Sequence, residues 1–160
     1  MSKTNNSVVK LLDKLNIKYD FYKHEPITSS QIIDDIRKKL NLKGVESKNL
    51  FLKTKSNKFF LLVTDISKKF NKDFFKDLLN EKVSFATFEE LEKITGYKPN
   101  AAASFCYPKD IDIYVDNGIF NYEIFSISTG NLDETIELKT ESLKQLYENV
   151  ENKVIYLDYK

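Results

Sequence analysis

Two apolar runs joined by a short polar linker constrain the fold of this chain more than any other feature. The first run covers residues 50–53, and the second, residues 57–65, is aromatic or aliphatic at nearly every position after Lys58. The linking residues, 54–57, give the spacing of a β-hairpin. We therefore predict an antiparallel pair of strands in this part of the chain.

The residues that open the first strand combine a charge with an amide. If the strand begins at Lys48, its two-residue period sends Lys48 and Leu50 to one face and Asn49 and Phe51 to the other. A lysine at this place can orient an anionic or ester-bearing ligand, because its ammonium is a compact charge with three donors. The alternative is a solvated lysine beside an apolar strand, which is common in a chain this rich in lysine.

The remaining hydrophobic periodicity predicts an α+β fold. Helices alternate with strands that are mostly joined as hairpins, which favours a mixed, mostly antiparallel sheet that curls into a barrel-like core surrounded by helices. A length of 160 residues suits one domain spanning residues 1–160. The predicted helices cover residues 8–15, 28–40, 71–79, 87–94 and 140–149, and the further strands cover 17–21, 102–107, 111–115, 122–128, 135–138 and 154–157.

The charge balance limits how the protein can meet a nucleic acid. A net charge of +1 provides no global field that would hold DNA or RNA, so an RNA contact has to come from a local patch. Arg37 is the only arginine, and lysines must therefore supply the phosphate contacts as point charges. We expect modest, salt-sensitive affinity for RNA and no DNA partner.

Single residues exclude several kinds of site. One cysteine, Cys106, rules out an internal disulfide, and one histidine, His24, rules out a two-histidine metal site, so we expect no metal and no cofactor. The polar start at residues 1–6 is unlike a signal peptide, and no apolar run approaches the ~20 residues that span a bilayer. We expect a cytoplasmic protein without a membrane partner.

The segment Lys48-Asn49-Leu50-Phe51-Leu52 resembles the K-N-L-F-L motif of the YbaK-type prolyl-tRNA editing family. Residues 11–19, 23–26 and 83–91 resemble the opening helix and strand of that family, the turn that follows them, and its S-F-A strand. The resemblance implies a freestanding aminoacyl-tRNA deacylase, related to the insertion domain of bacterial prolyl-tRNA synthetase, with a curled barrel-like sheet. It also implies that Lys48 organises the 3′-terminal adenosine or the ester, with Asn49 supporting the geometry, and that the substrate's own vicinal hydroxyl helps to activate water.

A loop of small residues, 96–106, is the second candidate element. Small side chains let a ligand approach the backbone amides closely, which suits recognition of a ribose or an ester carbonyl. The family usually carries a glycine and a proline where this chain has Asn100 and Ser104; asparagine tolerates the left-handed backbone of glycine, whereas the lost proline removes a constraint. A helix ended by Gly96 and followed by a plain strand is the alternative. The predicted substrate-binding residues of the loop are Asn100, Ala101, Ala102, Ala103 and Ser104.

The third candidate element is the polar turn over residues 126–135. We predict that Ser128, Thr129 and Gly130 line the pocket, while a solvated hairpin turn is the alternative for residues 131–134. His24 is a weaker candidate for a general base than for a structural hydrogen bond.

The resulting hypothesis is a trans-editing hydrolase that deacylates mischarged aminoacyl-tRNA, with tRNA for proline carrying a small non-cognate amino acid as its substrate. An aminoacyl ester is labile, so positioning and a polarised carbonyl suffice for its hydrolysis. The predicted partners are the aminoacylated acceptor end and the cognate synthetase. The alternatives are a noncatalytic module that binds aminoacyl-tRNA or an amino acid on the same fold, and a regulator that reads a free amino acid.

Overall fold

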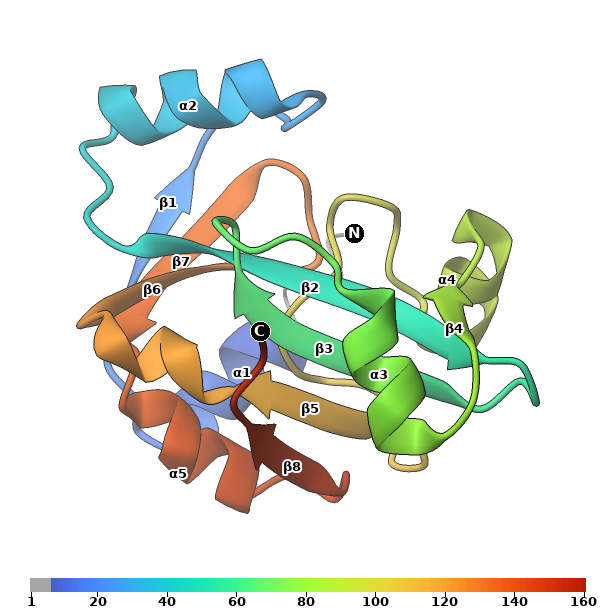
Figure 1. The fold of residues 1–160 in the computed structure, drawn as a ribbon. Coiled ribbons are helices and arrows are strands. Elements are labelled where there is room, and N and C mark those ends of the chain that lie inside the picture. The colour runs from blue at the N-terminus through green and yellow to red at the C-terminus, as the bar shows by residue number, and fades with distance from the viewer. Residues whose placement is uncertain (1–6) are drawn as a thin grey trace.

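The computed structural model describes residues 7–160 and contains one curled, unclosed eight-stranded sheet (Figure 1). The polar start at residues 1–6 lies outside the described residues. The strands are Tyr19–Lys23 (β1), Val45–Thr54 (β2), Phe59–Asp65 (β3), Val83–Phe85 (β4), Asp112–Asp116 (β5), Ile124–Ser128 (β6), Glu134–Lys139 (β7) and Val154–Leu157 (β8). The helices are Ser7–Lys14 (α1), Ser30–Lys39 (α2), Lys72–Leu79 (α3), Phe88–Thr95 (α4) and Ser142–Glu148 (α5), with a 3₁₀ helix at Asn117–Asn121 (η2).

The sheet follows the order β1-β7-β6-β2-β3-β5-β8, and β4 adds to β2. Four strand pairs are antiparallel, namely β1 with β7, β2 with β3, β2 with β4 and β6 with β7. The pairs of β2 with β6, β3 with β5 and β5 with β8 are parallel. The predicted α+β class with a mixed, mostly antiparallel curled sheet is confirmed.

The β2–β3 hairpin is confirmed in the predicted place, with Lys53 opposite Phe59 and Ser47 opposite Asp65. β2 begins at Val45, several residues before the apolar run, because its first residues pair with β6. This length lets β2 join both halves of the sheet.

The predicted helix starts are confirmed by their caps. The side chains of Ser29 and Asn71 accept hydrogen bonds at the starts of α2 and α3, and Thr87 forms a reciprocal capping box with Glu90 at the start of α4. Gly96 ends α4 with a φ of 80°, in the left-handed region where glycine carries no steric cost.

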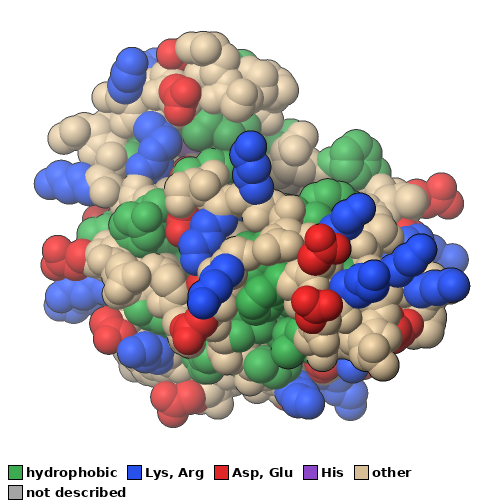
Figure 2. All heavy atoms as spheres, viewed as in Figure 1, with side chains coloured by type: hydrophobic (Ala, Val, Ile, Leu, Met, Phe, Trp, Pro, Cys, Tyr) green, Lys and Arg blue, Asp and Glu red, His purple; other side chains and the backbone are tan. Residues whose placement is uncertain are grey.

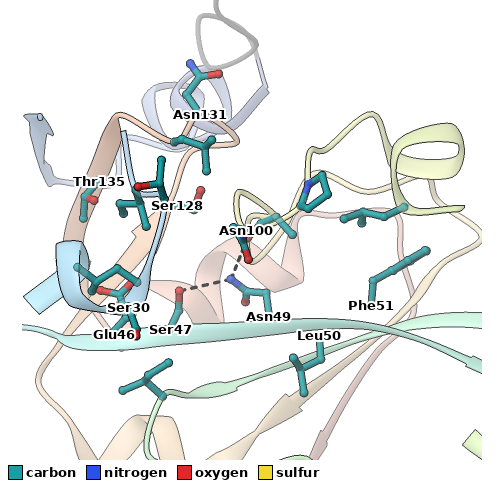
Figure 3. Close-up of a pocket in the computed structure, with 18 of the residues that line it drawn as sticks. Ser30, Glu46, Ser47, Asn49, Leu50, Phe51, Asn100, Ser128, Asn131 and Thr135 are labelled. Atoms are coloured by element: carbon teal, nitrogen blue, oxygen red, sulfur yellow. Dashed lines mark hydrogen bonds between the residues drawn. The ribbon is translucent and has the colours of Figure 1, made fainter. Parts of the chain in front are cut away.

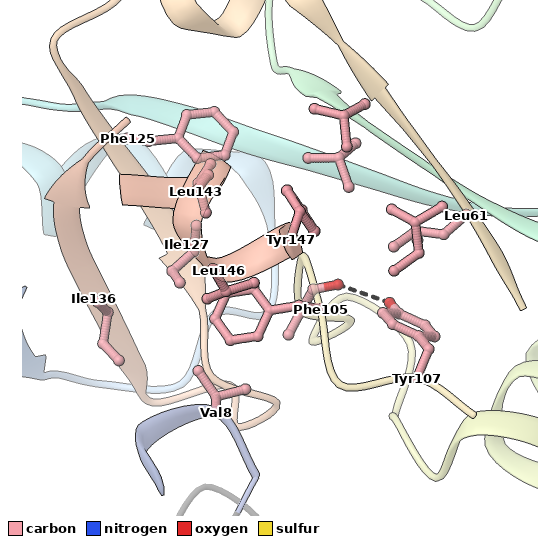
Figure 4. Close-up of a cluster of buried hydrophobic side chains, with 14 of the residues drawn as sticks. Val8, Leu61, Phe105, Tyr107, Phe125, Ile127, Ile136, Leu143, Leu146 and Tyr147 are labelled. Atoms are coloured by element: carbon pink, nitrogen blue, oxygen red, sulfur yellow. Dashed lines mark hydrogen bonds between the residues drawn. The ribbon is translucent and has the colours of Figure 1, made fainter. Parts of the chain in front are cut away.

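Alternating side chains of β3 enter two separate cores. Leu61 and Val63 join a large cluster beneath α1 and α5 (Figure 4), whereas Phe60 and Leu62 join a smaller one that α3 covers with Phe75. Both faces of the central strands are therefore buried, which explains why their sequence is apolar almost without alternation.

The predicted strand over residues 102–107 is wrong, because this segment is irregular. Cys106 has a φ of 70°, which a strand cannot accommodate. Three successive carbonyl groups bond to buried tyrosine hydroxyls instead of to a neighbouring strand. The pairs are Tyr107 Oη to Ala103 O at 2.7 Å, Tyr147 Oη to Ser104 O at 2.6 Å and Tyr97 Oη to Phe105 O at 2.8 Å.

The predicted strand over residues 122–128 begins later than expected, at Ile124, because η2 occupies the preceding turn. The Asp116 side chain accepts a hydrogen bond from Gly118 N at 2.8 Å and so starts η2. Among the described helices, none is long and apolar enough to cross a membrane.

Candidate functional site

A pocket of about 520 Å³ lies over the first half of β2 (Figure 3). Its walls come from four places that are distant in sequence: the start of α2, the loop after α4, the β6–β7 turn and the β4–α4 connection. In that order, the walls include Thr28, Ser29 and Ser30; Asn100 and Ala102; Ser128, Asn131, Glu134 and Thr135; and Phe85 and Phe88.

The strand period predicted for β2 is confirmed. Asn49 and Phe51 project toward the pocket side in Figure 3, together with Ser47, and Phe51 joins the large core cluster. Leu50 packs with the small cluster on the opposite side. Lys48 is on the side of Leu50, and it does not line the pocket.

Asn49 joins the pocket floor to the loop above it. Its Nδ2 donates to Ala102 O at 3.1 Å and to Ser47 Oγ at 3.3 Å, and its Oδ1 accepts from Ser104 Oγ at 2.9 Å. Both amide hydrogens are thus used within the protein. Asn49 therefore holds the loop in place and has no spare donor for a substrate.

The loop keeps its predicted shape at Asn100, which has a φ of 67° in the left-handed region. Ser104 is fully buried, and its hydrogen bonds to Asn49 and Tyr147 constrain the backbone where the family has proline. The N–H groups of Asn100 and Ala102 donate no hydrogen bond to the described residues. Both residues line the pocket, and these two amides are the unpaired backbone donors that they carry there.

The β6–β7 turn supplies the opposite wall. Ser128 lines the pocket, and its hydroxyl donates to Ala101 O at 3.0 Å while accepting from Gly130 N at 3.1 Å. Ala101 and Gly130 themselves line a shallower neighbouring hollow. Thr129 is buried behind the wall, where its hydroxyl donates to Glu134 Oε1 at 2.8 Å.

Two carboxylates line this pocket, and each is paired with a cation. Glu46 Oε1 accepts from Arg37 Nη1 at 3.0 Å, and burial raises the Glu46 pKa against the opposing effect of that guanidinium. Glu134 is buried and accepts a hydrogen bond from Lys23 at 3.3 Å. Arg37 also donates to Ser126 and to Gly44 O, so the one guanidinium of the chain is occupied inside the fold.

Lys48 lies outside the lining of the pocket. Its ammonium donates to Lys68 O at 2.6 Å, in the segment that follows β3. Ile66, in the same segment, lines the pocket and bonds through its N–H to Glu46 O at 3.0 Å. Two of the three donors of the Lys48 ammonium have no partner among the described residues.

His24 bonds to the protein rather than facing the pocket. Its Nε2 lies 2.8 Å from Thr135 Oγ1 and its Nδ1 lies 2.7 Å from Glu25 O, so the ring supports the wall from behind. Across residues 7–160, no cluster of three histidine, cysteine, aspartate or glutamate side chains could hold a metal ion.

The structure brings four of the ten predicted site residues to the pocket surface: Asn49, Asn100, Ala102 and Ser128. Ala103, Ser104 and Thr129 are buried behind it. Sequence reasoning missed the carboxylates and the aromatic mouth, since nothing in the local pattern places α2 or β4 beside β2. Ser47 could have been found, because it shares the strand parity of Asn49.

The model of the aminoacyl-tRNA editing domain family matches residues 33–146. The prolyl-tRNA editing protein ProX of Acetoanaerobium sticklandii is 24% identical to the chain over an alignment of 148 positions, which covers 88% of each protein. The family assignment rests on the domain match. At 24% identity, the activity that the name of ProX describes is not carried over to this chain.

Two solved structures share the fold. A hypothetical protein superposes with a TM-score of 0.77 at 16% identity, over 93% of this chain and 97% of the other. A candidate trans-editing enzyme for prolyl-tRNA synthetase superposes with a TM-score of 0.76 at 15% identity, over 100% of this chain and 99% of the other.

Proposed function

Because the chain belongs to the aminoacyl-tRNA editing domain family, we propose that it is a trans-editing hydrolase of mischarged aminoacyl-tRNA. The similarity to a prolyl-tRNA editing protein supports tRNA for proline, carrying a small non-cognate amino acid, as the substrate. Water adds to the ester carbonyl carbon and the bond to the ribose oxygen breaks. The products are the free amino acid and a tRNA with its terminal hydroxyl restored.

The observation that carries this proposal is the loop held over β2 by Asn49, in which the pocket-lining residues Asn100 and Ala102 have N–H groups without a partner among the described residues. Amide donors fixed before the reaction stabilise the negative charge that develops on an ester oxygen. Asn49 acts as a positioning residue for these donors, since its own amide is engaged. Glu46, with one carboxylate oxygen bound to Arg37, offers the other to the α-ammonium of the aminoacyl group.

Two aromatic side chains at the pocket mouth, Phe85 and Phe88, can contact the terminal nucleotide, together with Lys48 of β2. Phe85 is 53% exposed and Phe88 is 68% exposed, although both line the pocket. Exposed aromatic rings stack on nucleobases, at about 1–3 kcal/mol per base. We propose that the terminal adenine stacks there while the free donors of Lys48 bind the ribose or phosphate of the same nucleotide.

Recognition should depend on the acceptor end, because Arg37 is engaged inside the protein and cannot read an RNA helix. An aminoacylated acceptor minihelix is therefore expected to be cleaved about as well as intact tRNA. A minihelix that stays uncleaved while tRNA is hydrolysed would instead favour a complex with the cognate synthetase.

The decisive experiment is deacylation of a panel of mischarged tRNAs, with uncleavable aminoacyl-adenosine as a binding probe. Rapid release of a small amino acid from tRNA for proline is the expected result. Binding of the probe without hydrolysis of any tRNA would replace the enzyme by the noncatalytic binding module on the same fold.

Lys48→Ala tests the mouth. Loss of a contact made in the transition state typically costs about 2.7–4 kcal/mol, so we expect kcat/KM to fall roughly 10²–10³-fold. Lys69→Ala is the matched control, because Lys69 is an exposed lysine next to Lys68, whose carbonyl group the Lys48 ammonium contacts. If the two variants behave alike, Lys48 does not contact the substrate.

A further inference from the structure

A second hollow of about 410 Å³, which we call the lysine groove, is lined by four lysines. Lys55 comes from the β2–β3 turn, Lys72 and Lys76 from α3, and Lys82 from the residues before β4. All four are exposed, and none forms an ion pair within the described part of the chain. Asp73 is the one acidic residue of the lining.

The lysines converge because of the backbone that carries them. Lys72 and Lys76 are one helical turn apart and share a face of α3. Lys55 N donates to Lys82 O at 2.9 Å, which brings the turn against the start of β4. Figure 2 shows the resulting gathering of basic side chains over α3, β4 and the turn, at the right of the molecule.

The lysine groove stands out against the charge of the whole chain. Its four lysines and one aspartate carry a net +3, whereas the chain carries +1, so the remaining residues carry a net −2. A polyanion is therefore attracted to this place more than to the rest of the surface.

The lysine groove and the pocket share β4. Val83 and Ser84 line the lysine groove, and the next two residues, Phe85 and Ala86, line the pocket. A strand advances about 3.3 Å per residue, so a ligand leaving the mouth at Phe85 meets the lysine groove almost at once.

We propose that the lysine groove binds backbone phosphates of the acceptor stem of an aminoacyl-tRNA whose charged end occupies the pocket. This inference rests on the proposed function, and it adds where the rest of the RNA lies. Lysine point charges suit phosphates of any sequence, so this contact contributes affinity and orientation rather than base readout. The lysine groove supplies the local basic patch that a chain with a net charge of +1 needs to bind RNA.

The test compares two triple variants of the full chain that remove the same charge. The groove variant replaces three of the four groove lysines: Lys72→Gln, Lys76→Gln and Lys82→Gln. The control variant replaces exposed lysines of α1 and of the segment before β8: Lys10→Gln, Lys14→Gln and Lys153→Gln. Binding of an uncharged acceptor minihelix is followed by fluorescence anisotropy between roughly 50 and 200 mM salt. Hydrolysis of an aminoacylated minihelix and of an aminoacylated CCA trinucleotide is measured in parallel.

Emptying the lysine groove should weaken minihelix binding about tenfold or more at low salt and flatten the log–log salt slope by about 2, at ~0.7–0.9 per phosphate contact. Trinucleotide hydrolysis should be unchanged, since this substrate has no stem. Wild-type affinity and slope in the groove variant, or an equal loss in the control variant, would overturn the inference. Minihelix binding that depends on the groove lysines, with no hydrolysis by the wild type, would instead retain the lysine groove and reject the proposed function.

Discussion

Strand β2 and the loop over residues 97–107 both line the pocket, but they are held in place by different means. β2 pairs through its backbone with β3, β4 and β6. The loop has no strand partner, and three of its carbonyl groups accept hydrogen bonds from tyrosine hydroxyls. The floor of the pocket is thus fixed by a backbone ladder and the roof by side chains.

This difference teaches where the precision of the site comes from. Tyr147 reaches Ser104 from 43 residues away, and Ser104 reaches Asn49 across 55 residues. The loop therefore takes its shape only when α5 and β2 are already packed. Asn49 is the point at which the two kinds of support meet, and variants around it can separate them.

Among the variants that separate floor from roof, the largest effect is expected from Asn49→Ala, which breaks the link between them. A displacement of about 1 Å can cost 10²-fold in rate, so we expect kcat to fall by about that factor while KM changes little. Single-turnover hydrolysis of an aminoacylated minihelix measures it. Ser47→Ala, which removes only the 3.3 Å contact, is the control and should lose no more than a few-fold. Equal losses in the two variants would deny Asn49 its linking role.

Tyr147→Phe removes a support of the roof and leaves the floor intact. The buried Ser104 carbonyl loses its partner, which costs about 1–3 kcal/mol of unfolding free energy. Urea denaturation followed by far-UV circular dichroism provides the value. The control is Tyr122→Phe, at a 40% exposed side chain, which should change the unfolding free energy by less than about 0.5 kcal/mol. Indistinguishable variants would mean that the hydroxyl does not support the roof.

Alkaline pH should loosen the protein through the roof tyrosines. Burial raises the pKa of Tyr97, Tyr107 and Tyr147 above the ordinary value of 10.0. Above that pH the unfolded chain releases protons that the folded chain retains, so stability present below pH 10 is lost as the pH rises.

Well above pH 10 each such tyrosine contributes about 1.4 kcal/mol per pH unit to that loss, and about half of this at pH 10 itself. Tyr147→Phe should therefore reduce the slope of unfolding free energy against pH by this amount, whereas Tyr122→Phe should leave the slope as in the wild type. Denaturation midpoints between pH 9 and 11 give the slopes. A wild-type slope in Tyr147→Phe would show that this phenol already ionises in the folded state.

The smallest effect is expected from restoring the family residues in the roof. Asn100 already has a left-handed backbone, so Asn100→Gly should alter stability by less than about 1 kcal/mol and leave turnover within a few-fold. Ser104→Pro should do no better than the wild type, because it removes the hydroxyl that bonds to Asn49. A double variant that gains tenfold or more in deacylation would show that the Asn100 and Ser104 loop is impaired.

The contrast between floor and roof also explains what the sequence could predict. The β2–β3 hairpin, the helix starts near Asn71 and Thr87 and the side on which Asn49 lies all follow from local patterns, and they are confirmed. The strand predicted over residues 102–107 is wrong, because three of its carbonyl groups bond to tyrosine hydroxyls, one of them 43 residues away, instead of to a neighbouring strand. Local propensity contains no information about such partners.

The pocket itself was predictable only in part. Asn100, Ala102 and Ser128 were expected there from small or polar loop composition, and they line it. Lys48 was expected to face the pocket, yet its strand parity places it on the face opposite Asn49, and its ammonium meets Lys68 O. Glu46, Phe85 and Phe88 enter through the curl of the sheet and the return of β4 to β2, which require the tertiary fold.

The way the roof is held has a consequence for how such proteins diverge. Residues 103–105 are held through their backbone carbonyl groups by Tyr107, Tyr147 and Tyr97, so these three tyrosines have to be kept, whereas other loop positions contribute mainly backbone groups that every amino acid has. The glycine and proline of the family can then be replaced while the active-site shape is inherited. Lineages with this tyrosine scaffold are free to vary the residues that touch the amino acid, and so to change which error they correct.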